Sequence, residues 1–304
     1  MTRECRNCGA SELQDLGPIG NVAPFFLKRV LGMELRLPRS TNPLKQKFRE
    51  LAAYPISLLK RLTTQNAFVD LQVCTKCCFI STKVAFHDED IVRLYSDYRS
   101  PSYNQERIHY EPSYAPIAAA VGYDEKEVMG RTAASTAFLS KAIDAGNSFT
   151  ILDYGGSDGR FLPHLPGAKF VYEISNIDPV PGVTRIGSES ELGTYSLVHI
   201  AHVTEHVPHP LKLIRKLRTY IKPGGYLYVE TPQEITDQER EGLRNGSLRK
   251  DICIHEHINS YCVPAVSCLL QSAGFELIDI ERAPVDLGWT KGFHIRALGR
   301  LQNP

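Results

Sequence analysis

The sequence predicts an α/β protein in which an open, mostly parallel sheet with helices on both faces follows a small cysteine-rich domain. From about residue 125 onward, short apolar runs alternate with helical stretches, as expected for βαβ units. The apolar run at 149–152 ends in Asp153 and a glycine-rich turn. Two C-x2-C pairs stand in the first hundred residues, and such pairs are typical of metal-binding domains.

Composition places the chain among ordinary globular proteins. Of its 304 residues, 42% are hydrophobic and 23% charged, and the formal net charge is +1. This balance gives no reason to expect nucleic acid as a partner. The sequence shows no apolar leader and no apolar run long enough to cross a bilayer, so we expect a cytoplasmic protein with reduced thiols.

The four N-terminal cysteines are predicted to bind one structural zinc ion. Cys5 and Cys8 form the first C-x2-C pair, and Cys74 and Cys77 form the second. Four thiolates make a closed tetrahedral site, which suits a structural rather than a catalytic ion. Two unrelated pairs of buried cysteines are the alternative.

The two pairs are separated by an insertion at about 28–65 with a basic character. It contains nine basic residues against two acidic ones, and its apolar residues recur near helical spacing on both sides of Pro55. This pattern predicts a basic amphipathic helix, interrupted at the proline, that can bind an anionic membrane surface or a partner protein. A solvated basic face of the domain itself is the alternative.

A tyrosine-rich stretch leads from the cysteine pairs into the sheet. Residues 101–124, with the residues just before them, are expected to be either a linker or a substrate segment. Tyrosine offers a flat apolar face with a hydroxyl at its edge, which suits a sugar or a nucleotide. The candidates are Tyr95, Tyr98, Tyr103, Tyr110 and Tyr114.

The stretch ILDYGGSDGRFL predicts a strand, a tight turn and a helix at 160–165 that together bind a nucleotide. Glycines in the turn let the backbone approach a ligand closely. The turn is not the dinucleotide fingerprint G-x-G-x-x-G, which disfavours a nicotinamide-dependent oxidoreductase. Two acids compete for the ribose: Glu173 at the end of the next predicted strand, and Asp178 at the more usual spacing of about twenty residues.

Further along, the sequence predicts a strand at 195–207 with a histidine-rich turn, a helix from Leu211 and a strand at 222–232. Together these elements resemble the class I S-adenosylmethionine-dependent methyltransferases. The motifs that carry the resemblance are ILDYGGSDG, Glu173, HVTEHVPHP and IKPGGYLYVETP.

The remaining motifs are similar to those of sugar C-methyltransferases that carry an N-terminal zinc-binding domain: CRNCGA, VCTKCCFI, LYSDYRS and HEHINSY. This resemblance implies a zinc-binding domain at 1–100 and a Rossmann-like methyltransferase domain at 125–304 that binds S-adenosylmethionine. It also implies that DLGWTKGFHIRALGR is the reduced form of a further C-terminal domain.

The resemblance assigns the cofactor to Asp153, Gly155, Gly156, Ser157, Gly159, Glu173, Asp178 and His202. Methyl transfer from a sulfonium requires in-line positioning and removal of the acceptor proton. His206 and His257 are the candidate bases, since histidine titrates near working pH. Glu256 is expected to assist them, and Glu205 and His255 are supporting candidates. A metal site of His202, Glu205 and His206 is an alternative interpretation.

We therefore expect methyl transfer to a sugar, either a nucleotide-sugar or a surface glycan, on oxygen or carbon. The alternative is a non-catalytic scaffold of the same fold that docks through residues 28–65 on a membrane-associated glycan-assembly complex.

Overall fold

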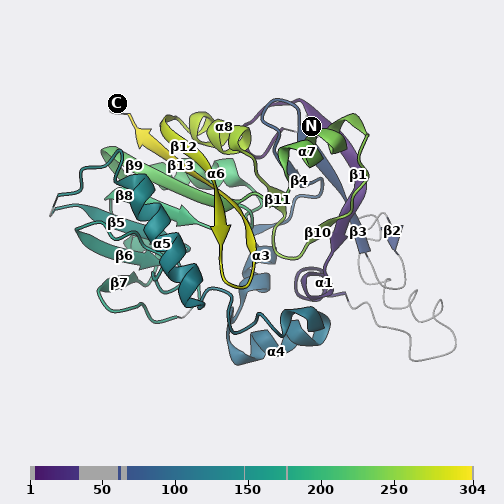
Figure 1. Cartoon of the computed structure of the whole chain (residues 1–304), viewed down its shortest axis with the longest axis horizontal. Helices are drawn as coiled ribbons and strands as arrows, with labels where there is room; N and C mark the ends of the chain where they lie inside the picture. Colours follow the sequence, from purple (N-terminus) through teal and green to yellow (C-terminus); the bar gives the residue numbers. More distant parts are fainter. Residues whose placement is uncertain (1–3, 34–60, 63–66, 147, 176, 303–304) are drawn as a thin grey trace.

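The computed structural model describes residues 4–33, 61–62, 67–146, 148–175 and 177–302. They form two sheets joined by helices and loops (Figure 1). Most of the predicted basic insertion at 28–65, including its expected amphipathic helix, lies outside the described residues. None of the helices in the described ranges combines the length and apolar character needed to cross a membrane.

The larger sheet carries the predicted α/β architecture. In the described residues its strand order is β12-β13-β9-β8-β5-β6-β7. The strands are β5 (Thr150–Tyr154), β6 (Ala168–Tyr172), β7 (Val183–Ile186), β8 (Tyr195–Ala201), β9 (Ile221–Pro232), β12 (Phe275–Asp286) and β13 (Lys291–Leu301). Strands β5 to β9 run parallel, and β13 is antiparallel to both of its neighbours. The order reverses at β5, which opens a crevice for a ligand at the carboxyl ends of the strands.

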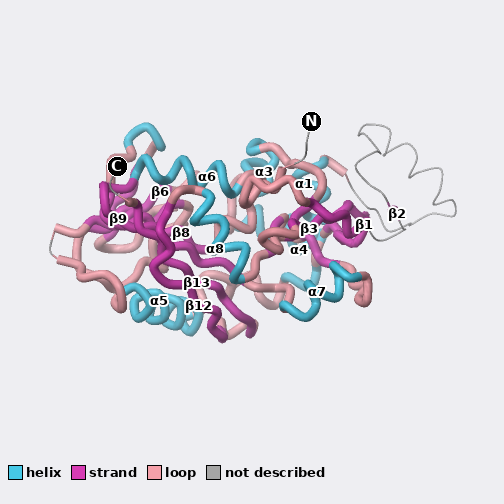
Figure 2. The backbone as a smooth tube through the Cα atoms, turned by 90° about the horizontal axis from the view of Figure 1, so that it is seen from above, coloured by secondary structure: helices cyan, strands magenta, loops and turns pink. Residues whose placement is uncertain are grey.

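Helices cover both faces of this sheet, which confirms the predicted fold class (Figure 2). They are α5 (Glu125–Leu139) on one face, and α6 (Pro210–Leu217) and α8 (Val263–Ser272) on the other. Alternate strand residues point to opposite faces. Accordingly, Leu152 and Val198 pack in the core beneath α6 and α8, whereas Ile151 and Leu197 pack beneath α5.

The helix predicted at 160–165 is wrong, because this stretch forms turns and loop between β5 and β6. Pro163 and Pro166 explain the difference, since proline lacks an amide hydrogen and clashes with the preceding helical turn. Leu162 and Leu165 still pack into the core beneath α5. Two side chains thus cover the sheet where a helix was expected.

The expectation for DLGWTKGFHIRALGR is also wrong. These residues form the end of β12, the following turn and most of β13. Strand β13 pairs with β9 along residues 226–232. The segment therefore completes the larger sheet and does not form a reduced extra domain.

The smaller sheet combines segments from both ends of the chain. Its order is β10-β1-β3-β4-β11, and β2 pairs with β3. The strands are β1 (Leu13–Val22), β2 (Arg61–Leu62), β3 (Ala67–Cys74), β4 (Ile80–Thr82), β10 (Ile252–Ile254) and β11 (Asn259–Ser260). Because β10 and β11 come from residues 252–260, this sheet does not close within residues 1–100. The expected domain limits stay a prediction.

Among the described residues, four further helices lie around the smaller sheet (Figure 1). They are α1 (Pro24–Leu31), α3 (Asp88–Tyr95), α4 (Pro101–Tyr110) and α7 (Asp237–Asn245). Helix α1 packs against α3 and α4. Within the predicted tyrosine-rich segment at 101–124, residues 101–110 form α4 and residues 112–114 a 3-10 turn, and α4 lies below both sheets in the view of Figure 1.

Candidate active site

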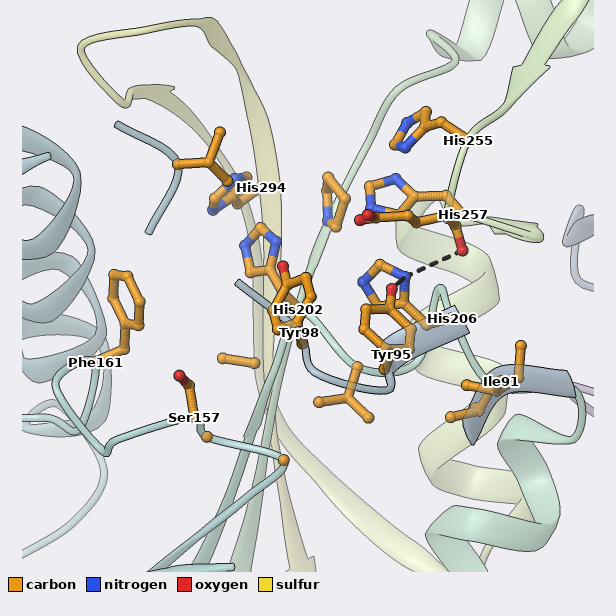
Figure 3. A pocket seen from close by; sticks show the side chains of 18 of the residues that line it. Ile91, Tyr95, Tyr98, Ser157, Phe161, His202, His206, His255, His257 and His294 are labelled. Atoms are coloured by element: carbon orange, nitrogen blue, oxygen red, sulfur yellow. Dashed lines mark hydrogen bonds between the residues drawn. The ribbon is translucent and has the colours of Figure 1, made fainter. Parts of the chain in front are cut away.

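A cavity of about 1120 Å³ opens at the carboxyl ends of β5, β6, β8 and β9. Figure 3 shows Ser157 on one side of this cavity, His206 and His257 on the other, and His202 between them. The predicted residues that line it are Asp153, Gly155, Gly156, Ser157, Glu173, His202, His206, His255, Glu256 and His257. Gly159, Asp178 and Glu205 are not part of the lining.

The turn after β5 has a backbone that only small residues accommodate. Gly155 has a φ of 73° and Ser157 a φ of 57°, in the left-handed region that glycine occupies most easily. A Cβ at Gly156 would clash with the carboxylate of Asp153. The turn therefore brings bare backbone to the cavity wall.

Asp153 presents a free carboxylate oxygen at this turn. The side chain is 2% exposed, and its Oδ1 lies 2.8 Å from Nδ1 of His199. Its Oδ2 is buried and has no hydrogen-bond partner among the described residues. An unpartnered buried acceptor of this kind suits an amino group of a ligand.

His199 was missed by the sequence analysis. It is 1% exposed and stacks on Tyr228, with ring centroids 4.8 Å apart and an interplanar angle of 6°. Its contact with Asp153 orients the carboxylate. The available signal was a polar residue inside an otherwise apolar predicted strand.

Glu173 lies directly after β6, where its carboxylate faces the turn. Oε2 accepts a hydrogen bond from the amide of Ser157 (2.9 Å), and Oε1 accepts one from the amide of Ser175 (3.1 Å). Each oxygen keeps a second lone pair, which suits the two hydroxyls of a ribose. Asp178, the rival acid, is exposed and outside the lining.

His206 is held in place as a neutral imidazole. Its Nδ1 lies 2.7 Å from the hydroxyl oxygen of Tyr95 and 3.1 Å from the carbonyl oxygen of Glu256. Burial, reinforced by the charge of His257, lowers the pKa of His206 to about 3. This imidazole is therefore uncharged at neutral pH.

The pKa of His257 is shifted in the opposite direction. Its Nδ1 lies 2.8 Å from Oε1 of Glu234. Burial lowers the pKa of His257, but Glu234 more than offsets this effect, and the resulting pKa is about 9. The rings of His206 and His257 lie 4.6 Å apart, so a neutral and a protonated imidazole are neighbours.

Glu205 lies behind these histidines. It is 1% exposed, and its Oε1 is 3.5 Å from Nδ1 of His202 and 3.9 Å from Nε2 of His206. Burial raises the pKa of Glu205 to about 7. His202, Glu205 and His206 do not converge as one metal site among the described residues; Glu205 and His206 converge instead with His257.

The Glu256 carboxylate is engaged by two side chains of α4. It forms an ion pair with Arg107 and accepts a hydrogen bond from the hydroxyl of Tyr103 (3.0 Å). These contacts hold α4 against the 255–257 segment. Glu256 therefore acts as a positioning residue. Of the candidate tyrosines, the cavity is lined by Tyr95, Tyr98 and Tyr114.

A second buried network, also missed by the sequence analysis, surrounds Glu230 on β9. Its Oε1 lies 3.2 Å from both Arg131 and His294, and its Oε2 lies 2.9 Å from Arg296. His202 packs edge-on against His294, and the backbone φ of His202 is 57°. Because two guanidinium groups neutralise Glu230, this cluster does not suit a cation.

The four predicted cysteines come together at the edge of the smaller sheet. The Sγ atoms of Cys5 and Cys77 lie 3.8 Å apart, as do those of Cys8 and Cys74. All four sulfurs lie within 4.8 Å of one another. A tetrahedral zinc site with bonds of about 2.3 Å has sulfur–sulfur edges of about 3.8 Å, so this arrangement fits the ion.

Comparison with known proteins identifies the family. Residues 123–280, just over half of the chain, match the family described as "Methyltransferase domain". The curated relatives include ubiquinone biosynthesis O-methyltransferases. That of Vibrio parahaemolyticus serotype O3:K6 is 27% identical over 104 residues, which cover 31% of this chain and 44% of the relative. That of Paraburkholderia xenovorans is 42% identical over 41 residues, which cover 14% of this chain and 18% of that relative.

The chain thus spans less than half the length of these curated relatives. Among solved structures, the 1,6-didemethyltoxoflavin-N1-methyltransferase of Burkholderia thailandensis is 15% identical. Its TM-score is 0.44, with 65% of this chain and 87% of that chain covered. From the match over 123–280 and the order of the larger sheet, the chain belongs to the methyltransferase domain family, in the class I S-adenosylmethionine-dependent group.

Proposed function

We propose that this protein transfers a methyl group from S-adenosylmethionine to a sugar, on oxygen or carbon. The observation that carries the proposal is one continuous cavity that joins the glycine turn and Glu173 to the His206–His257 pair. A scaffold that only retains the fold does not require both sets of side chains in one cavity.

The residues around the turn fit the cofactor. The free Oδ2 of Asp153 would accept the amino group, and Glu173 would hold the ribose hydroxyls. The backbone at Gly155 and Gly156 leaves room for the ligand chain. When bound, S-adenosylmethionine supplies a methyl group on a positively charged sulfur.

The protein's own task is to orient the acceptor and take its proton. With the cofactor bound, its sulfonium would supply the methyl group and depart as the neutral thioether, and the chain's own part would be to receive the acceptor proton at a base. We assign this base to His257, with Glu234 on its other nitrogen. Glu234 stabilises the imidazolium that forms when His257 takes the proton, and the lower pKa of His206 makes that imidazole a poorer proton acceptor.

A polyhydroxyl acceptor is supported by the tyrosines and histidines of the lining. Tyr95, Tyr98 and Tyr114 combine apolar faces with hydroxyl groups, as carbohydrate sites do. The curated relatives are named as O-methyltransferases, which supports oxygen as the attacked atom.

The test begins with calorimetric titration of S-adenosylhomocysteine, with NAD as the control. Binding of the first and not the second is expected. Turnover is then measured with nucleotide-sugars and with phenolic acceptors in parallel. Methylation of a phenol but of no sugar would overturn the acceptor class, and absence of S-adenosylhomocysteine binding would favour the scaffold.

We further propose that the four cysteines hold a structural zinc ion, which fits their 3.8 Å sulfur separations. No disulfide joins these cysteines to one another or to the other described cysteines, and we propose a cytoplasmic location. Contact of residues 28–65 with a membrane or partner stays a proposal from the sequence.

A further inference from the structure

Arg99 is held in an unusual position in the cavity wall. It follows α3 and lines the cavity. Its guanidinium carbon lies 4.9 Å from the ring centroid of Tyr98 and 5.3 Å from that of Tyr123. Its φ of 63° lies in the left-handed region, which costs free energy for a residue with a side chain. A Cβ at Gly122 would clash with the guanidinium, so a glycine here leaves the space that the Arg99 side chain occupies.

The charge of Arg99 has no carboxylate partner among the described residues. Its Nη1 is buried and makes no hydrogen bond there. The other arginines of the lining are paired: Arg107 with Glu256, and Arg131 with Glu127 and Glu230. A guanidinium remains charged at any working pH, and a buried charge is costly unless it is paired.

The acid whose charge acts on Arg99 is already engaged. Glu127 accepts hydrogen bonds from Arg131 (3.2 Å), from the amide of Gly122 (2.9 Å) and from the indole of Trp289 (2.7 Å). These three donors hold the Glu127 carboxylate, which forms no ion pair with Arg99 among the described residues. A side-chain hydrogen bond with Tyr98 engages part of the guanidinium, whereas its Nη1 has no partner among the described residues.

We propose that Arg99 binds an anionic group, a carboxylate or a phosphate, of a ligand in this cavity. The planar fork of arginine matches both anions with two parallel hydrogen bonds. The inference rests on the proposed function, which supplies two sources. One is the amino-acid carboxylate of the cofactor, and the other is a phosphate of an acceptor such as a nucleotide-sugar.

Calorimetry on the full chain separates the two sources. The ligands are S-adenosylhomocysteine, 5′-methylthioadenosine, which lacks the amino-acid part, and pyrophosphate. If the cofactor brings the anion, Arg99→Gln weakens S-adenosylhomocysteine at least about tenfold and leaves 5′-methylthioadenosine unchanged. If the acceptor brings it, Arg99→Gln abolishes pyrophosphate binding and leaves both nucleosides unchanged.

Two variants control for folding and for general loss of charge. Arg99→Lys keeps the charge and should retain more affinity than Arg99→Gln for the same anion. Arg93→Gln removes an exposed arginine of α3 that pairs with Asp90 and should change no affinity. The thermal midpoint of each variant shows whether it is folded.

The inference is overturned if folded Arg99→Gln binds all three ligands as tightly as the wild type does. Failure of the proposed function looks different, because the wild type itself would then bind no S-adenosylhomocysteine. Pyrophosphate binding that depends on Arg99 in such a protein would still support the anion site.

Discussion

At the scale of single residues, Glu173 and Asp178 differ in what surrounds them. Glu173 is fixed by two backbone amides at the cavity, whereas Asp178 is exposed and outside the lining. We expect Glu173→Ala to weaken S-adenosylhomocysteine about 10- to 100-fold, since hydrogen bonds to a charged group contribute about 1.5–3 kcal/mol. Calorimetry measures this, with Asp178→Ala as the control. Equal losses in the two variants would contradict the assignment of the ribose to Glu173.

A second residue-scale prediction concerns the pH dependence of turnover. Because His257 has a pKa of about 9, it is protonated at neutral pH and must lose its proton to act as base. We expect kcat to rise with pH, about tenfold per unit, and to level off near pH 9. A base with the pKa of His206, about 3, would instead give a flat profile above about pH 5.

Glu234→Gln tests the cause of this profile. The titratable groups that face His257 are Glu205, His206, Glu234, His255 and Glu256. Removing the Glu234 carboxylate lowers the pKa of His257, so the rising limb should move to lower pH. An unmoved limb in the variant would remove His257 from the role of base.

At the scale of elements, the turn after β5 depends on the absence of a side chain. Gly156→Ala places a Cβ against the carboxylate of Asp153, so the turn must shift away from the cavity. We expect at least about a tenfold loss of S-adenosylhomocysteine affinity, measured by calorimetry. Gly130→Ala in α5 meets nothing within 4 Å and should stabilise that helix by about 0.5–1 kcal/mol. Normal affinity in Gly156→Ala would show that the turn is not part of the site.

The strands expected at 149–152 and 195–207 were predictable because each contains a short apolar run. The helix at 160–165 was mispredicted although its two prolines were visible, because the glycine turn suggested the usual strand–turn–helix order. Helical periodicity gives a segment an apolar face, but proline removes the hydrogen bonds that a helix needs. Here Leu162 and Leu165 cover the sheet without that helix.

At the scale of the whole molecule, the cysteine site joins distant parts of the chain. The four cysteines share a core cluster with Leu211 of α6 and Ala265 of α8. Arg240 of α7 donates hydrogen bonds to the carbonyls of Cys78 (2.7 Å) and Tyr261 (2.9 Å). Loss of the metal should therefore loosen the contact between the two sheets.

We expect one zinc ion per chain by elemental analysis of the wild type. Cys74→Ser should release it and lower the free energy of unfolding by at least about 2 kcal/mol. The exposed Cys253 provides the control, since Cys253→Ser should keep both zinc and stability. A wild type that contains no zinc, or a Cys74→Ser variant with unchanged stability, would contradict the structural role.

The sequence by itself determined the fold class, the strand–turn that opens the cavity and the cysteine pairs, because each depends on residues that lie close together in the chain. Only the tertiary structure decided which polar side chains share a cavity. It brought Glu173 rather than Asp178 to the turn, directed the Glu256 carboxylate to Arg107, and left the Arg99 guanidinium without a carboxylate from the part of the chain that the structure describes. The physical reason is that pairing and burial of a charge depend on neighbours supplied by distant elements, which no local pattern specifies.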